Sequence, residues 1–405
     1  MSGFAVRFFF FFSLSLSSLS APLDRSLLSR SPPCSSLSLA PPPPPNSTDI
    51  GANLCDPMFQ GSYGGKSYHE PDLSSVLRRA RGAGVGRIVV TAGSLAESAE
   101  ALEMAASSSS TSSSSPVELF CSAGVHPTRA GELVVAGNDG GGGGGGEERE
   151  KKTLDAAAVA RLRALLREGT ESDDDSKQPR LVALGETGLD YARLQFADAE
   201  AQRLAFGAQL DLAAELGGRL PLFLHLRDAG DDFISLLSEP RFNKTDTSSS
   251  SSVPVALRGV VHSFDGGVDL MRRLLALENR DLFIGFNGCS LRDETGLEAA
   301  RQVPIDRLLL ETDAPWCDLR PSHASSAAQQ GSFELKEFDE RVGAVWKDKK
   351  KVGKDDKTSL IKGRNEPCRI AAVAETVAAA RGCSVAEVAR AAWENSERLF
   401  FGGGG

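Results

Sequence analysis

The 405-residue sequence has no CxxC pair, and its seven cysteines are scattered and odd in number. Disulfide frameworks use even numbers of cysteines, and zinc ribbons use closely spaced pairs. We therefore expect reduced thiols, in neither a disulfide framework nor a zinc ribbon.

An excess of positive charge is also missing. The chain holds 45 Lys and Arg residues against 54 Asp and Glu residues, which gives a net charge of −9. Nonspecific attachment to nucleic acid rests on a broad basic surface that neutralises phosphates, and this composition argues against one. A local cationic or metal-lined site stays compatible with it.

Long hydrophobic runs are absent. The apolar run at residues 8–12 is too short to span a bilayer, so no stable membrane association is expected. Residues 1–46 are expected to form a disordered leader; they are rich in Ser and Leu, with Arg25 and Arg30 but one acid, Asp24. This composition favours a transit peptide for a plastid or mitochondrion. A secretory signal, or an unprocessed leader in a cytosolic or nuclear protein, is the alternative.

No phosphate-binding loop is present, because the glycine run at 140–146 lacks the GxxxxGK[ST] ending. Several low-complexity tracts cannot bury apolar area and are expected to be disordered surface insertions. They are residues 107–115, 140–146, 171–175 and 247–252, and the glycine tail 402–405 is similar.

The remaining sequence alternates strand-like and helix-like segments. Helical spacing of apolar residues predicts helices at 73–82, 155–167, 198–216 and 270–278. Strand–helix repetition eight times predicts a single-domain (β/α)8 TIM barrel over 47–401, with an open doubly wound sheet as the alternative. The eight predicted strands are 50–53, 87–91, 119–125, 181–185, 220–225, 257–262, 282–286 and 308–313.

Metal-capable side chains follow four of these apolar runs: Glu186, His225, His262 and Asp313. In a barrel, residues past the carboxyl ends of the strands line the active site, so these four would converge. Each alone has an ordinary structural explanation, but unpaired charges are costly to bury at strand ends. A shared metal explains all four at once. Carboxylates with imidazoles suit Mg²⁺, Mn²⁺ or Zn²⁺.

The chain resembles the TatD family of metal-dependent deoxyribonucleases, within the amidohydrolase-like barrels. The resemblance rests on motifs in family order: DIGANL, TAGS, AGVHPTR, LGETGLDY, LPLFLHLRDA, VVHSFDG, IGFNGCS, LLLETDAPW, RNEP and NSERLFF. It implies a barrel that hydrolyses DNA phosphodiesters, typically as a 3′→5′ exonuclease. It also implies metal ligation by Glu186, His225, His262 and Asp313.

One departure concerns the first strand. Many members of the wider superfamily carry an HxH ligand pair there, whereas Gly51 and Asn53 occupy these positions here. Imidazole is a better zinc ligand than a neutral amide, so a tightly held two-zinc centre is disfavoured. One or two Mg²⁺ ions are the favoured cofactor, with Mn²⁺ or Zn²⁺ as alternatives.

The expected mechanism gives Glu186 and Asp313 catalytic roles. Glu186 would bridge the ions, and Asp313 would orient or deprotonate the attacking water. Asp190 is expected to act behind the ligands rather than on substrate.

Three residues are candidate substrate contacts. His126 and Arg227 would bind phosphate, with a helix-start hydrogen bond and a salt bridge as their ordinary alternatives. Arg364 resembles a family position that faces the site, and an ion pair with Glu366 is its alternative.

The substrate is expected to be single-stranded or frayed DNA. Exposed aromatic residues suit unstacked bases, and a recessed metal site suits chain ends. Two other functions compete with this one: a barrel hydrolase acting on a small ester, amide or phosphotriester, and a noncatalytic scaffold. Fold and ligands alone do not separate the first of these from a nuclease, because barrels of many activities share them.

Overall fold

The computed structural model describes residues 47–110, 117–137, 151–170, 179–243, 257–328, 345–353, 356 and 358–402. The predicted leader and the glycine run lie outside these ranges, and so do the tracts at 171–175 and 247–252. The serine tract differs from expectation in part. Its first four residues, 107–110, continue helix α2 (Leu95–Ser110), and its other five lie outside the described residues.

Eight parallel strands form one sheet, in which each strand pairs with the next strand of the sheet along the chain. The sheet closes where the end of the first strand meets the backbone after the last strand. Asp313 N donates to Gly51 O at 2.8 Å, and Asn53 N donates to Ala314 O at 2.7 Å. The predicted barrel is therefore confirmed over the open sheet. The strands are β1 (Ser47–Ala52), β4 (Val85–Val90), β5 (Glu118–Ala123), β8 (Leu181–Asp190), β9 (Leu222–Arg227), β10 (Leu257–His262), β11 (Arg280–Phe286) and β12 (Leu308–Leu310).

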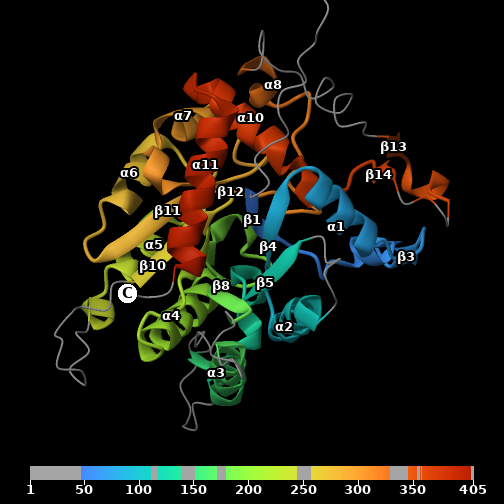
Figure 1. The fold of residues 1–405 in the computed structure, drawn as a ribbon. Helices are drawn as coiled ribbons and strands as arrows, with labels where there is room; N and C mark the ends of the chain where they lie inside the picture. Colours follow the sequence, from blue (N-terminus) through green and yellow to red (C-terminus); the bar gives the residue numbers. More distant parts are fainter. Residues whose placement is uncertain are drawn as a thin grey trace, which may run out of the picture. The chain divides into compact units, whose positions relative to one another are not determined.

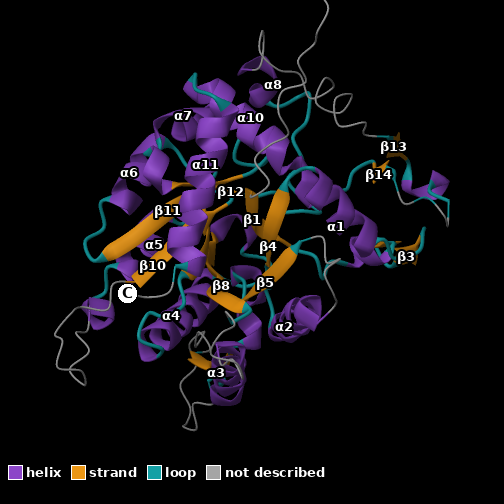
Figure 2. Cartoon of the chain, in the orientation of Figure 1, coloured by secondary structure: helices purple, strands orange, loops and turns teal. Residues whose placement is uncertain are grey.

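Helices surround the strands in Figures 1 and 2. The four predicted helices are confirmed, as α1, α3, α4 and α6. The α-helices are α1 (Leu73–Gly82), α2, α3 (Ala156–Thr170), α4 (Ala199–Glu215), α5 (Gly230–Leu237), α6 (Val268–Leu275), α7 (Glu294–Gln302), α8 (Ala324–Ala328), α10 (Ile370–Arg381) and α11 (Val385–Ser396). A π-helix, η9 (Glu397–Phe401), follows α11. None of the described helices is long and apolar enough to cross a membrane.

Short elements fill the connections. The 3-10 helices are η2 (Pro57–Gln60), η3 (Pro127–Glu132), η4 (Tyr191–Arg193), η5 (Pro240–Asn243), η6 (Ile305–Arg307), η7 (Lys349–Lys351) and η8 (Pro367–Arg369). The small strands are β2 (Ser62–Tyr63), β3 (Lys66–Ser67), β6 (Val134–Ala136), β7 (Lys152–Leu154), β13 (Trp346–Lys347) and β14 (Leu360–Ile361). The antiparallel pair β6–β7 and helix η3 both lie in the connection from β5 to α3, and η4 follows β8.

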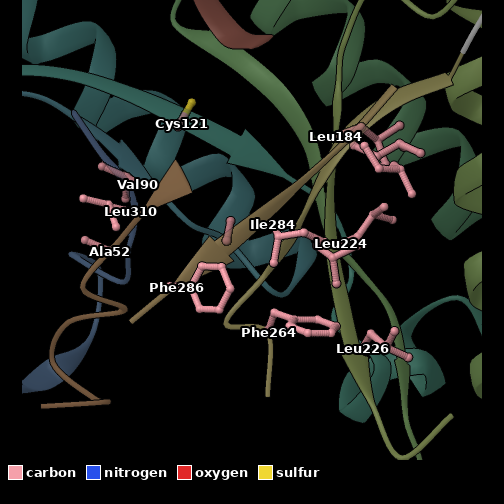
Figure 3. Close-up of a cluster of buried hydrophobic side chains, with 14 of the residues drawn as sticks. Ala52, Val90, Cys121, Leu184, Leu224, Leu226, Phe264, Ile284, Phe286 and Leu310 are labelled. Atoms are coloured by element: carbon pink, nitrogen blue, oxygen red, sulfur yellow. The ribbon is translucent and has the colours of Figure 1, made fainter. Parts of the chain in front are cut away.

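Strand residues alternate between two hydrophobic clusters. One fills the barrel and includes Val89, Phe223 and Phe283, whereas the neighbouring positions Val90, Leu224 and Ile284 join the larger cluster that packs against the helices (Figure 3). Both faces of each strand are thus buried, which explains why the strands read as unbroken apolar runs. The barrel interior is packed, so polar side chains gather past the carboxyl ends of the strands.

Candidate active site

Glu186 is the centre of the site. Its carboxylate atom Oε1 lies 2.7 Å from Nε2 of His262 and 2.9 Å from Nδ1 of His225. Glu186 lies inside β8, where the pairing register with β9 shifts, and β9 continues past His225. The sequence-based strand ends were therefore too early for both, but the expected convergence of these three residues is seen.

His126 is a third imidazole at the same carboxylate. Its Nδ1 accepts a hydrogen bond from the backbone N–H of Thr128, which caps the start of η3. Its Nε2 lies 3.4 Å from Oε1 of Glu186. The helix-start bond expected as the ordinary alternative is present, and it leaves the second ring nitrogen facing the site. Donor atoms of His126, Glu186 and His225 lie within 4.8 Å of one another, close enough to share a metal ion.

Asp313 lies where the first and last strands of the barrel meet. It has φ 52, and Oδ1 accepts a hydrogen bond from Asn53 Nδ2 at 2.8 Å. The thiol of Cys317 donates to Oδ2 at 3.1 Å. Asp313 lines one cavity of about 790 Å³ with Glu186, His225 and His262. All four predicted ligands thus face one cavity, although Asp313 stands outside the tight group around Glu186 Oε1.

The donor set fits a divalent cation. His225 Nδ1 and His262 Nε2 face each other at 3.3 Å beside one carboxylate oxygen. Imidazole nitrogens and carboxylate oxygens are donor atoms that divalent metal ions bind. Behind His225, Nε2 lies 3.4 Å from Oδ2 of Asp190, too poorly aligned for a hydrogen bond, and neither atom has a hydrogen-bond partner among the described residues.

Burial and pairing compete in the electrostatics of the group. Burial raises the pKa of Glu186, but the charges of His262 and His126 and the hydrogen bonds from His225 and His262 outweigh it and hold the pKa well below the usual value. Burial lowers the pKa of His262, yet the carboxylates of Glu186 and Glu311 raise it well above the usual value. For His225, the nearby carboxylates of Asp190 and Glu186 overcome burial and raise the pKa.

Two further groups differ from these. Burial lowers the pKa of His126 to about 3 despite the opposing charge of Glu186, so its ring is neutral. Nδ1 also lies 2.7 Å from the Thr128 hydroxyl, and the alternative tautomer, in which Nδ1–H donates to that hydroxyl, leaves Nε2 available to a metal. Burial raises the pKa of Asp313 to about 6, although the charge of His262 and the Cys317 hydrogen bond act in the opposite direction.

Glu311, which sequence reasoning missed, stands behind His262. Its fully buried Oε2 lies 3.4 Å from Nδ1 of His262, and neither atom has a hydrogen-bond partner among the described residues. Its Oε1 accepts from the backbone N–H of Ser263. A buried acid in LLLETDAPW, two positions before Asp313, was the available signal, since alternate strand residues share a face.

Gly51 explains the departure from the HxH pattern. A Cβ atom at Gly51 would stand 2.6 Å from Oε2 of Glu311 and 3.0 Å from the ring of Phe223. The space that a histidine side chain would need there is filled by Glu311 and Phe223. Asn53, the second departing position, instead donates to Asp313 and accepts from the Thr91 hydroxyl at 3.1 Å.

The two remaining predicted substrate contacts, Arg227 and Arg364, differ in their positions. Arg227 lines the cavity, and its Nε lies 3.8 Å from Oδ2 of Asp265. The expected substrate contact by Arg364 is wrong in this structure, because its guanidinium is fully buried and lies outside the cavity lining. It pairs with both carboxylate oxygens of Asp72 at 2.7 Å and with Glu366 at 2.8 Å. The alternative ion pair with Glu366 is confirmed.

Comparison with known proteins shows which family of barrel proteins this chain belongs to. Residues 48–401 match the family model described as TatD related DNase. The chain belongs to this family. The TatD resemblance drawn from the motifs is confirmed, and the TatD-related chain is an enzyme of the hydrolase class.

Individual relatives cover nearly the same span. "Deoxyribonuclease Tat-D" of Schizosaccharomyces pombe is 36% identical over 354 residues, which are 87% of this chain and 94% of the relative. "3'-5' ssDNA/RNA exonuclease TatD" of Erwinia tasmaniensis is 32% identical, over 87% of this chain and 98% of the relative. A crystal structure of an uncharacterized amidohydrolase from Saccharomyces cerevisiae is 34% identical, with TM-score 0.72 over 88% of this chain and 99% of that one.

Proposed function

We propose that the protein hydrolyses phosphodiester bonds of DNA with Mg²⁺, as a 3′→5′ exonuclease on single-stranded or frayed ends. The observation that carries the proposal is the convergence of His126, His225 and His262 on Glu186 at the floor of a cavity that Asp313 also lines. The family to which the chain belongs supports DNA as the substrate.

The bacterial relative named as a 3'-5' ssDNA/RNA exonuclease supports the exonucleolytic mode. The cavity supports it too, since Glu186 and His262 are buried within it, at the carboxyl ends of the strands. Arg129, Arg193, Arg227 and Arg292 line the cavity. Guanidinium groups bind phosphate with paired hydrogen bonds, which suits a strand end entering there.

Glu186, His225, His262 and His126 are the residues that would hold the ion. When bound, a divalent cation supplies positive charge to the scissile phosphate and promotes ionisation of a nearby water. Asp313 orients that water and takes its proton. Asn53 and Cys317 fix Asp313, because the Asn53 amide donates to Oδ1 and the Cys317 thiol donates to Oδ2. Arg227 binds a phosphate oxygen of the substrate.

Mg²⁺ is the proposed ion in preference to Zn²⁺. The two HxH imidazoles of the wider superfamily are replaced by Gly51 and Asn53, and no cysteine thiolate belongs to the described group around Glu186. The carboxylates of Glu186 and Asp313 suit Mg²⁺ and Mn²⁺, whereas the imidazoles of the group also accept Zn²⁺, so the preference for Mg²⁺ rests on the two missing imidazoles and the missing thiolate.

The mode is tested with the full chain and single-stranded DNA labelled at either the 5′ or the 3′ end. With Mg²⁺, the 5′-labelled strand should shorten stepwise, and the 3′ label should be released at once as a mononucleotide. Blunt duplex should be cut more slowly than the same strand alone. Cuts at internal positions, at equal rates in the 5′-labelled and the 3′-labelled single strand, would overturn the exonuclease mode. Turnover of a small phosphotriester that oligonucleotide does not inhibit would favour a small-substrate hydrolase instead.

A further inference from the structure

An exposed apolar patch lies beside the catalytic cavity. Phe196 is 67% exposed, and Leu194 and Val135 are each 44% exposed. All three line a separate hollow of about 360 Å³ between the β6–β7 hairpin and the segment after η4. Large apolar side chains that gather on a surface mark binding sites more often than scattered ones do.

The hollow adjoins the catalytic cavity along two segments of the chain. In η3, Arg129 lines the cavity and Gly131, two residues later, lines the hollow. After β8, Arg193 lines the cavity and the next residue, Leu194, lines the hollow. Both segments follow the carboxyl ends of barrel strands, where substrates of such barrels bind. The two arginines therefore stand on the border between the cavity and the apolar hollow.

Charge on this border suits a polyanion. The side chains of Arg129 and Arg193 are about half exposed. Arg193 is only loosely paired, with its Nε 3.6 Å from Oδ2 of Asp190, and Arg129 pairs with Glu97 at 3.1 Å. Lys152 lines the hollow itself and pairs with Asp198. The lining thus combines apolar surface with cations that keep part of their hydrogen-bonding capacity.

We propose that this hollow is a subsite for the bases of a single nucleic-acid strand whose end occupies the catalytic cavity. The proposal rests on the proposed function. Phe196 stacks on an unpaired base, and Leu194 and Val135 make further apolar contacts with that base. Arg129 and Arg193 hold the phosphate that links this nucleotide to the one in the cavity. An aromatic ring accepts any base but only an unstacked one, so the subsite selects single strands without reading sequence.

A strand explains the lining better than a protein partner does. A protein-binding patch need not lie next to the catalytic cavity, whereas a strand must leave the cavity across its rim. Arg129 and Arg193 place cations at that rim, where the sugar–phosphate backbone would cross. The apolar residues begin directly beyond them, as unpaired bases require.

The test uses full-length wild type, Phe196→Ala and Phe196→Trp, with Val385→Ala as the matched control. Val385 is also an exposed apolar residue, at 37%, and lines neither the cavity nor the hollow. Binding of a fluorescent oligo-dT of about 12 nucleotides, within the site size of single-strand grooves, is followed by anisotropy in EDTA. Turnover with Mg²⁺ is measured on the same strand and on the p-nitrophenyl ester of thymidine 5′-monophosphate, which fills the cavity alone.

Phe196→Ala should raise Kd and KM for the strand roughly tenfold, with the small ester unchanged. Phe196→Trp and Val385→Ala should each keep the wild-type Kd and KM for the strand. Equal strand binding by wild type and Phe196→Ala would overturn the subsite. So would light scattering that shows Phe196→Ala dissociating a wild-type dimer with strand binding unchanged. Failure of the wild type on both substrates would instead refute the proposed function.

Discussion

Nδ1 of His262 stands 3.4 Å from Oε2 of Glu311, at a fully buried carboxylate on the side of the ring opposite Glu186. The imidazole is thus held between two carboxylates. Carboxylates behind metal-ligating histidines fix the tautomer and the ring orientation. Glu311 is itself fixed by the backbone N–H of Ser263 and by the absence of a side chain at Gly51.

Glu311→Gln should therefore weaken metal binding by about 10- to 100-fold, which is the usual effect of losing such a partner. The amide keeps the shape but removes the charge that orients His262. Calorimetric titration with Mn²⁺ measures the effect without relying on turnover. Gly51→Ala, which forces a methyl group against the same carboxylate, should act in the same direction.

A stability-matched control separates orientation from general damage. Leu166→Ala opens a cavity under α3, outside the barrel, and should lower the melting temperature while Mn²⁺ affinity stays at the wild-type value. If Glu311→Gln binds Mn²⁺ as tightly as wild type does, Glu311 has no positioning role.

His126→Asn tests whether His126 binds the metal or only the substrate. The asparagine Oδ1 can still accept from the Thr128 N–H and cap η3, but the atom that faces Glu186 is gone. We expect weaker Mn²⁺ binding together with a lower kcat. A rise in KM for DNA with Mn²⁺ affinity unchanged would restrict His126 to the phosphate.

The barrel and the four converging residues were predictable because each depends on a local pattern. Buried parallel strands give apolar runs, and the polar residue that ends a run marks the catalytic face, as for His225 and His262. The strand limits were less accurate at Glu186, since β8 continues through a register shift that leaves no mark in composition.

Contacts across the barrel were not predictable. The pairing of Glu311 with His262 depends on which side chains meet inside the barrel. The need for a glycine at position 51 is understood only once Glu311 is seen to occupy the adjacent space. The role of Arg364 was likewise not predictable. Its motif suggested a place near the site, but in the folded chain its side chain binds Asp72, the residue before α1.

Asp49 gives a pH dependence of stability. Burial raises its pKa to about 8, although hydrogen bonds from the hydroxyl and the backbone N–H of Thr312 act in the opposite direction. The unfolded value is about 3.9, so between about pH 4 and pH 8 the native state carries a proton that the unfolded state lacks. Stability from this group is complete below about pH 4 and is lost as pH rises to about 8, by up to about 1.4 kcal/mol per unit.

Asp49→Asn imitates the protonated acid and lacks this titration. The free energy of unfolding of wild type minus that of the variant should therefore fall as pH rises from about 5 to about 8. Urea unfolding across this range measures the difference, in which groups common to both proteins cancel. A difference that stays constant with pH would show that Asp49 is ionised in the folded protein.

Arg364→Met tests the corrected role of Arg364. Removing the guanidinium leaves Asp72 and Glu366 with Arg79 as their one ion-pair partner among the described residues, and breaking such a buried pair costs about 3 kcal/mol of unfolding free energy. KM for DNA, measured well below the melting temperature, should match wild type. A large rise in KM with stability intact would return Arg364 to the substrate.

The central claim is that this site cuts DNA with a divalent cation and Asp313. The most direct measurement compares full-length wild type and Asp313→Asn on 5′-labelled single-stranded DNA, with Mg²⁺ or with EDTA. Wild type should shorten the strand only with Mg²⁺, and the variant should lose about 10²- to 10⁴-fold in kcat while binding DNA as tightly as wild type. Shortening in EDTA, or an unchanged rate in Asp313→Asn, would contradict the account.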